Sequence, residues 1–380
     1  MALSTDVDRA TSALTRRRLP GPDVVRAIAL IGVVVMNYHG YLIITRGDGD
    51  AGAGWAAELF DPWNGPLSTR FAATFVLVAG VGVTLMTRST VDAARGHDAG
   101  RARFGTGDPI TAMRWRLVRR GVLLYTGGLV LEEIWPGTII PFYGAMFVAA
   151  AAMFTWRSRW ILVVGLVSAL AGWAIRIWRY RQRDDGISTE WLTDPGDGSV
   201  RGYVFGVFVN GTHPLFPWLA FFCCGILLGR VLGTSWWRPV ALGAGVFLAG
   251  IATAMSSGST TPFQDVVLST NPADRGLLYV TSALGTALAA YAAIDWLAER
   301  FPAATDPLRR AGQLSLSLYL LHIVVFNLAV DWLGWVEPAG LDLALTFAVG
   351  FWVVGLALAV GWQRRFGVGP AERVYRAFGG

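Results

Sequence analysis

Residues 24–45 read VVRAIALIGVVVMNYHGYLIIT, an apolar stretch with one charged residue, Arg26, near its start and two strongly polar residues, Asn37 and His39, toward its end. At 1.5 Å per residue, a helix of this length crosses a hydrocarbon core of roughly 30 Å. Similar stretches recur along the chain, whereas a closed membrane barrel would need alternating polar and apolar residues in segments of about ten. The sequence therefore predicts an all-α polytopic bundle of transmembrane helices.

The composition agrees with lipid as the surrounding solvent. Of the 380 residues, 54% are hydrophobic and 15% are charged, which is more apolar surface than a water-soluble domain can bury. The 32 basic residues are all arginine, so a Schiff-base lysine is excluded. The net charge is +6, and the arginines lie at the edges of apolar stretches. This distribution favours anionic membrane lipids over nucleic acid as partners. Cys223 and Cys224 are adjacent in an apolar stretch, so we expect neither a disulfide framework nor a metal site on them.

We expect about ten spans, with an eleventh half-span conceivable at 201–212. The ten predicted spans are residues 24–45, 66–87, 117–135, 138–156, 159–177, 214–233, 238–256, 276–297, 312–333 and 341–362. The chain then divides into an N-terminal tail at 1–22, a single transmembrane domain at 23–363 and a C-terminal tail at 364–380.

The distribution of arginine orients these spans. Arginines gather at 16–18, between 88 and 120, and after 363, and all of these segments fall on one side of the predicted bundle. By the positive-inside rule this side, which holds both termini, is predicted to be cytoplasmic in a multi-pass protein of the bacterial plasma membrane. One exception lies on the outer side, in a cluster of four arginines: Arg176, Arg179, Arg181 and Arg183. Neighbouring acidic residues could offset their charge, or an anionic lipid headgroup could bind to them.

Asn37 and His39 are candidate functional residues because polar groups at membrane depth are expensive. An imidazole near the outer end of a span can accept a proton from a hydroxyl or amine, and a nearby amide can hold an acyl oxygen. The alternative is a hydrogen bond between helices. At the inner end, Asp23 and Arg26 form an i, i+3 pair that either caps the helix or presents Arg26 to a phosphate of a cytoplasmic donor.

Other polar residues could join such a site. Glu132, at the outer end of the third span, is either a base or orienting group for a histidine, or a solvated helix end. His213 is either a binding residue or an interfacial cap, and His322 is either catalytic or a satisfied histidine within the ninth span. In the turn at 60–66, Trp63 beside Asn64 could form the wall of a sugar site, although tryptophans are common at membrane interfaces.

Several motifs recur in an order that resembles a known family. They are DxxRA at 23–27 with Asn37 in the helix that follows, WNG at 63–65, FVLVAG at 75–80, HPLFPW at 213–218, GQLSLSLY at 312–319 and GPAERVYR at 369–376. Together they cover nearly the whole chain, which resembles the heparan-alpha-glucosaminide N-acetyltransferase-like membrane family and its bacterial YeiB-like relatives.

The resemblance implies transfer of an acetyl group from cytoplasmic acetyl-CoA, through the membrane, to an acceptor on the far side. In the eukaryotic enzyme this acceptor is a terminal glucosamine. Asn37 matches an asparagine of the family's site. The family's catalytic histidine, three residues before its Trp-Asn-Gly, corresponds here to Phe60, which cannot move a proton. His39 is then the nearest substitute, followed by His213 and His322.

The leading hypothesis is a transmembrane acyltransferase that uses acetyl-CoA as donor and acylates a hydroxyl or amine of an extracytoplasmic sugar, glycolipid or small natural product. The alternatives are a transporter or flippase, and a non-catalytic subunit that binds the donor without turnover. No metal is expected, and the oligomeric state stays open, a homodimer included. The predicted site residues are His39, Asn37, His322 and Glu132 for catalysis, Arg26, Asp23, Arg119 and Arg120 for the donor, and Trp63, Asn64 and His213 for the acceptor.

Overall fold

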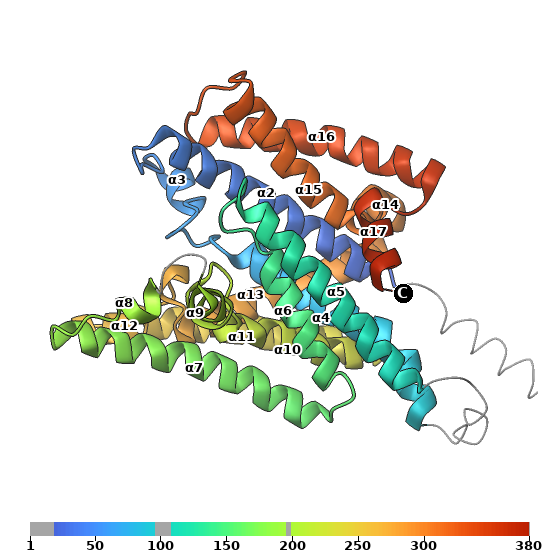
Figure 1. The fold of residues 1–380 in the computed structure, drawn as a ribbon, viewed down its shortest axis with the longest axis horizontal. Helices are drawn as coiled ribbons and strands as arrows, with labels where there is room; N and C mark the ends of the chain where they lie inside the picture. Colours follow the sequence, from blue (N-terminus) through green and yellow to red (C-terminus); the bar gives the residue numbers. More distant parts are fainter. Residues whose placement is uncertain (1–18, 96–107, 195–198, 380) are drawn as a thin grey trace, which may run out of the picture.

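The computed structural model describes residues 19–95, 108–194 and 199–379, and the regular elements in these ranges are helices (Figure 1). The predicted all-α class is confirmed. The long helices are α2 (Gly21–Arg46), α4 (Arg70–Arg95), α5 (Pro109–Glu132), α6 (Ile140–Met153), α7 (Ser158–Asp184), α10 (Leu215–Val231), α11 (Trp237–Ser256), α13 (Leu277–Arg300), α15 (Ser315–Phe326) with its π-helical continuation η5 (Asn327–Trp332), and α16 (Leu341–Phe366).

Short helices connect or cover the long ones. They are α3 (Trp55–Leu59), α8 (Glu190–Thr193), α9 (Val200–Phe205), η3 (Gly206–Asn210), α12 (Pro262–Val267), η4 (Pro272–Asp274), α14 (Pro302–Gln313) and α17 (Pro370–Gly379). Helix α17 lies in the segment predicted to be a C-terminal tail, and it packs against α5 and α15. The arginines at 16–18 and most of the predicted N-terminal tail lie outside the described residues.

Each of the ten predicted spans coincides with one long helix. Among the described residues, seven helices are long and apolar enough to cross a membrane, and the pair formed by 200–210 and α10, bent by 55°, would make eight. The first half of α5 carries several arginines and α6 has only 14 residues, so these two helices do not meet the same criterion. The chain is thus an all-α multi-pass membrane protein, while the count of ten spans remains a prediction.

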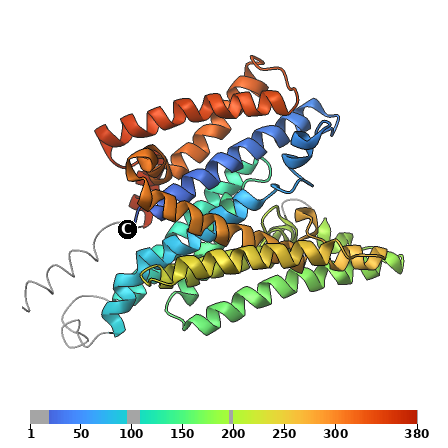
Figure 2. The same ribbon diagram turned by 180° about the vertical axis from the view of Figure 1, so that it is seen from behind.

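Helix α2 is the central element of the bundle. It begins at Gly21–Pro22, where a proline is tolerated because the first N–H groups of a helix have no intrahelical partner. It ends at Gly47, whose φ of 78° lets its N–H bond to the carbonyl of Ile43. Between these ends α2 packs against α4, α13, α14, α15 and α16. On the side seen from behind, α11 and α13 lie side by side (Figure 2).

Glycines set the close approach of α4 to α10. A Cβ atom on Gly225 would lie 1.9 Å from the carbonyl oxygen of Leu77, and one on Gly80 would lie 2.2 Å from that of Phe222. Small residues at such crossings let two backbones touch inside a membrane, where packing rather than water drives helix association.

Replacing Gly225 with alanine is therefore expected to destabilise the protein by about 3 kcal/mol, because the new methyl group meets backbone that cannot move aside. Thermal unfolding in detergent measures the effect. Gly243→Ala on α11 is the matched control, since a Cβ there would meet nothing within 4 Å. Equal melting temperatures for the two variants would contradict this account of the crossing.

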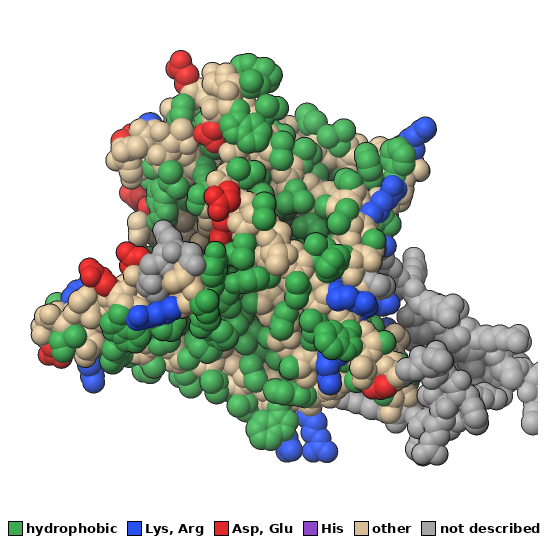
Figure 3. Space-filling view, viewed as in Figure 1, with side chains coloured by type: hydrophobic (Ala, Val, Ile, Leu, Met, Phe, Trp, Pro, Cys, Tyr) green, Lys and Arg blue, Asp and Glu red, His purple; other side chains and the backbone are tan. Residues whose placement is uncertain are grey.

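Charged side chains divide between the two ends of the bundle, with apolar side chains covering much of the surface between them (Figure 3). Acidic residues gather at the end that carries α3, α8 and α12, which we call the acidic end. Arginines gather at the opposite end, where α2 begins and the C-terminus lies, which we call the basic end. At the acidic end, Arg176 forms an ion pair with Asp274 at 2.5 Å, so a neighbouring acid offsets this member of the exceptional arginine cluster.

Candidate functional site

Two cavities lie along α2, one toward each end of the bundle. The Arg26 cavity, at the basic end, has a volume of about 380 Å³, and the Asn37 cavity, toward the acidic end, has a volume of about 430 Å³. Phe75 of α4 and Tyr319 of α15 line both cavities. These two side chains therefore form the partition between two spaces that approach each other from opposite ends of the bundle.

Helical geometry explains why α2 lines both cavities. Arg26 and Asn37 are eleven residues apart, which is close to three full turns, so both lie on one face of the helix about 16 Å apart.

His39, two residues beyond Asn37, lies about 200° around the helix axis from it. Its ring is buried, its Nδ1 lies 2.8 Å from the carbonyl oxygen of Phe60, and it lines neither cavity. The structure does not bring His39 to the site.

Asn37 is instead joined to His322. The Asn37 amide nitrogen lies 3.2 Å from Nε2 of His322, while the other ring nitrogen, Nδ1, contacts the carbonyl oxygen of Tyr319. A carbonyl oxygen can only accept, so Nδ1 carries a proton, and Nε2 of the neutral ring accepts from the Asn37 amide. The phenol of Tyr38 donates to the His322 carbonyl at 3.2 Å. The basic nitrogen of a fully buried imidazole is thus one hydrogen bond away from the wall of the Asn37 cavity.

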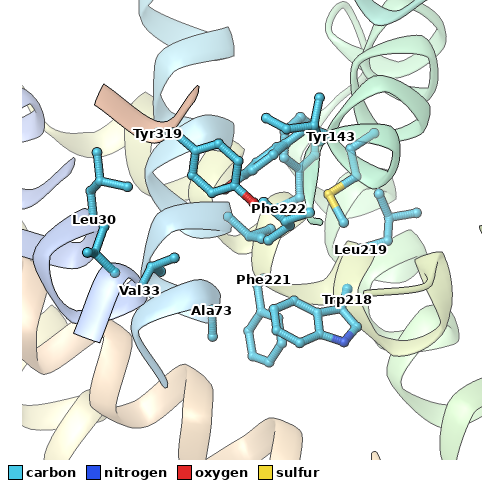
Figure 4. Packing of buried hydrophobic residues seen from close by; sticks show 14 of the residues in the cluster. Leu30, Val33, Ala73, Tyr143, Trp218, Leu219, Phe221, Phe222 and Tyr319 are labelled. Carbon is cyan, nitrogen blue, oxygen red and sulfur yellow. The ribbon is translucent and has the colours of Figure 1, made fainter. Parts of the chain in front are cut away.

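Tyr319 is fixed in the partition. Its hydroxyl forms a hydrogen bond with the hydroxyl of Thr138 at 2.9 Å, and its ring lies 4.8 Å from that of His322. Figure 4 shows Tyr319 pointing toward the buried side chains contributed by α6 and α10, among them Tyr143 and Phe222. The tyrosine is close to both the histidine and the boundary of the two cavities.

The Arg26 cavity carries an excess of positive charge. Its lining includes Arg26, Arg120 and Arg376 but one carboxylate, Glu372, among the residues the structure describes. Glu372 accepts hydrogen bonds from the first backbone N–H groups of α15, at 2.8 and 3.1 Å, and so caps that helix. Arg120 lies over the ring of Tyr375, 4.9 Å from its centroid, and burial raises the pKa of this tyrosine to about 12.

The remaining donor residues predicted from sequence are placed differently. Asp23 lies beneath Arg26, whose Nη1 donates to it at 3.4 Å, and it also accepts from Gln313 at 2.8 Å. Arg119 does not line the Arg26 cavity and donates to the carbonyl of Gly379 at 3.3 Å. Asp23 therefore supports the arginine that faces the cavity, and of the two adjacent arginines on α5 only Arg120 lines it.

Aromatic side chains and one arginine line the Asn37 cavity. Trp63 and His213 are in its wall, and the His213 ring lies 4.4 Å from that of Trp218. Asn64 is not in the wall; it accepts a hydrogen bond from Asn271 at 3.0 Å and so ties two loops together. Arg275, which sequence analysis missed, also lines this cavity.

Glu132 faces another space. It lines a cavity of about 280 Å³ between α5, α6 and η3, together with Tyr203 and Asn210. The structure thus separates Glu132 from Asn37 and His322. Across the described ranges, no group of three or more histidine, cysteine, aspartate or glutamate residues is arranged to hold a metal ion.

One comparison with known proteins bears on this site. A family model described as "Protein of unknown function (DUF418)" matches residues 223–379, from within α10 through α17, and this family is YeiB-like. The match includes Tyr319, His322, Arg275 and the cavity-lining residues of α17, whereas Arg26 and Asn37 lie before it. No curated protein matches the chain.

Proposed function

We propose that this protein is a transmembrane acyltransferase that passes an acyl group, such as acetyl, from a cytoplasmic acyl-CoA to a hydroxyl or amine of an acceptor on the other side. The arrangement that carries the proposal is the pair of cavities that share Tyr319 and Phe75 as a partition. Hydrolysis or transfer at one surface would need only one such cavity. The acceptor would be a sugar, a glycolipid or a small natural product.

The Arg26 cavity suits the donor. The positive-inside rule puts the arginine-rich end in the cytoplasm, where acyl-CoA is found. Guanidinium groups bind phosphates bidentately and stay charged, so Arg26, Arg120 and Arg376 would hold the phosphates of CoA. An extended pantetheine arm can then reach the roughly 16 Å that separate Arg26 from Asn37 along α2.

His322 and Asn37 suit the transfer step. In this mechanism the acceptor hydroxyl or amine takes the place of Asn37 at Nε2 of His322, which removes its proton. The acceptor atom forms a bond to the thioester carbon, the C–S bond breaks, and the CoA thiolate leaves and receives the proton from the imidazolium. The Asn37 amide donates to the carbonyl oxygen as negative charge develops on it.

A transporter or flippase is the second candidate. The 55° bend between 200–210 and α10 favours it, because broken helices often line the substrate path of transporters. A closed partition between two cavities is also what an occluded transport path would present. The acyltransferase hypothesis additionally explains why the basic cavity holds three arginines, and it requires acyl-CoA to bind.

Acetyl-CoA is therefore expected to stabilise the detergent-purified protein. A ligand present at 100 times its Kd adds about 2.7 kcal/mol to the free energy of unfolding, which thermal unfolding detects as a higher melting temperature. Glutathione, a thiol compound without phosphates, serves as the control and should leave the melting temperature unchanged. If neither acetyl-CoA nor longer acyl-CoAs raise it, the acyltransferase proposal fails and the transporter takes its place.

A further inference from the structure

Arg275 places a half-buried positive charge in the wall of the Asn37 cavity. It follows η4 with a φ of 50° and precedes α13, and this backbone conformation turns its side chain toward η3, where Nη1 donates to the carbonyl of Val209 at 2.9 Å. Burial lowers the pKa of Arg275 to about 10, which still leaves the guanidinium charged at neutral pH.

This charge has no carboxylate partner among the described residues. Its neighbour Asp274 is engaged by Arg176, and no aspartate or glutamate lines the Asn37 cavity. A second arginine, Arg70, lies close by, with Nη1 on the hydroxyl of Ser282 at 2.8 Å and its guanidinium 5.5 Å from the ring centroid of Tyr279. Arg70 and Arg275 thus both lie near Tyr279, and among the described residues no ion pair with an acid involves either of them.

Such an arrangement is costly unless something binds there. Removing a charged group from water carries an effective penalty of several kcal/mol, which an opposite charge in good geometry offsets. The guanidinium uses one of its five N–H groups on Val209, and those that face the cavity remain available to a ligand. Trp63 and Trp218 in the same wall supply flat apolar surface for the uncharged part of a ligand.

We propose that the Asn37 cavity binds an anionic ligand, a carboxylate or phosphate carried by a sugar or by a lipid headgroup, and that Arg275 is the residue that selects the negative charge. The inference rests on the proposed function in one respect: it identifies this ligand with the acceptor. The anion site itself follows from Arg275, its burial and the cavity it lines.

Matched probes test the charge directly. Glucuronate carries a carboxylate in place of the C6 hydroxymethyl group of glucose, and glucose 1-phosphate carries a phosphate on the anomeric hydroxyl. Phosphatidylglycerol differs from phosphatidylcholine in carrying net negative charge. We expect the wild-type protein, in phosphatidylcholine nanodiscs, to bind an anionic probe at least tenfold more tightly than its neutral counterpart by calorimetry. Preference for glucuronate or glucose 1-phosphate indicates a soluble sugar acid, and preference for phosphatidylglycerol indicates a lipid headgroup.

Variants assign that preference to Arg275. Arg275→Gln should reduce the discrimination to less than twofold, while Arg275→Lys, which keeps the charge, should retain part of it. Arg201→Gln is the matched control, because Arg201 is another arginine of the acidic end whose guanidinium donates to the carbonyl of Trp191 and lies outside the cavity wall. Retention of the wild-type melting temperature to within a few degrees shows that Arg275→Gln is folded.

Two results would overturn the inference: equal binding of charged and neutral probes by the wild-type protein, or equal loss of discrimination in Arg275→Gln and Arg201→Gln. The test is separate from that of acyl transfer because it uses no acyl-CoA. Anion binding at Arg275 without any stabilisation by acyl-CoA would remove the acyltransferase proposal and leave the anion site standing.

Discussion

Replacing His322 with glutamine is expected to lower acyl transfer by about 100- to 10,000-fold, the usual loss when a positioned general base is removed. Glutamine keeps a similar volume and can still form a hydrogen bond with Asn37, but its amide cannot accept a proton from the acceptor. The measurement is transfer of radiolabelled acetyl from acetyl-CoA to material in membrane vesicles that contain the protein. Stabilisation by acetyl-CoA should persist, since His322 does not line the Arg26 cavity.

His39→Gln provides the direct comparison. His39 is as buried as His322, and neither ring lines a cavity. His322 is bonded to the cavity-lining Asn37, whereas Nδ1 of His39 contacts the carbonyl of Phe60, so we expect transfer within about threefold of wild type. Loss of transfer in His39→Gln together with normal transfer in His322→Gln would restore the assignment suggested by sequence. It would also mean that the substrate contacts the face of α2 that carries His39, opposite the face that carries Arg26 and Asn37.

Replacing Arg26 or Arg120 with alanine should weaken acetyl-CoA binding by about tenfold to a hundredfold each. Hydrogen bonds to charged groups contribute about 1.5–3 kcal/mol, and each arginine would lose such contacts with the phosphates. Titration of the melting temperature with acetyl-CoA measures the change.

Arg119→Ala is the matched control for this pair of variants. It removes the same charge one residue away from Arg120 on α5, but its side chain reaches the carbonyl of Gly379 rather than the cavity. We expect its acetyl-CoA titration to stay within about twofold of wild type. If Arg119→Ala weakened binding as much as Arg120→Ala, the donor would be attracted by the general charge of the basic end instead of the Arg26 cavity.

The helices were predictable because lipid imposes a simple rule. Backbone N–H and C=O groups must pair within each spanning segment, so a long apolar stretch becomes a helix whatever surrounds it. The same reasoning predicts Asn37, His39 and His322 as candidates, because they are polar residues inside apolar stretches. The 100° rotation per residue also shows that Arg26 and Asn37 share a face of α2 and that His39 does not. The sequence alone would have allowed that distinction.

Features that depend on contacts between distant segments were not predictable. Arg275 is a loop arginine, and nothing in its local sequence signals that η3 and the wall of the Asn37 cavity enclose it. Likewise, the residues of α17 looked like a tail, because an amphipathic segment of ten residues does not reveal that it will pack against α5. Glu132 and Asn37 are both at outer ends of predicted spans, which predicts that they are close, but Glu132 lines a different cavity beside η3.

The sidedness of the reaction tests the central claim most directly. In the proposed orientation, inverted membrane vesicles would expose the arginine-rich end, so membrane-impermeant radiolabelled acetyl-CoA added outside would reach the Arg26 cavity. We expect free CoA to appear outside and an equal amount of acetyl label to accumulate on product inside, protected from an impermeant esterase or amidase. Label on the outer face of the vesicles, or movement of a solute without release of CoA, would contradict transfer between the two cavities.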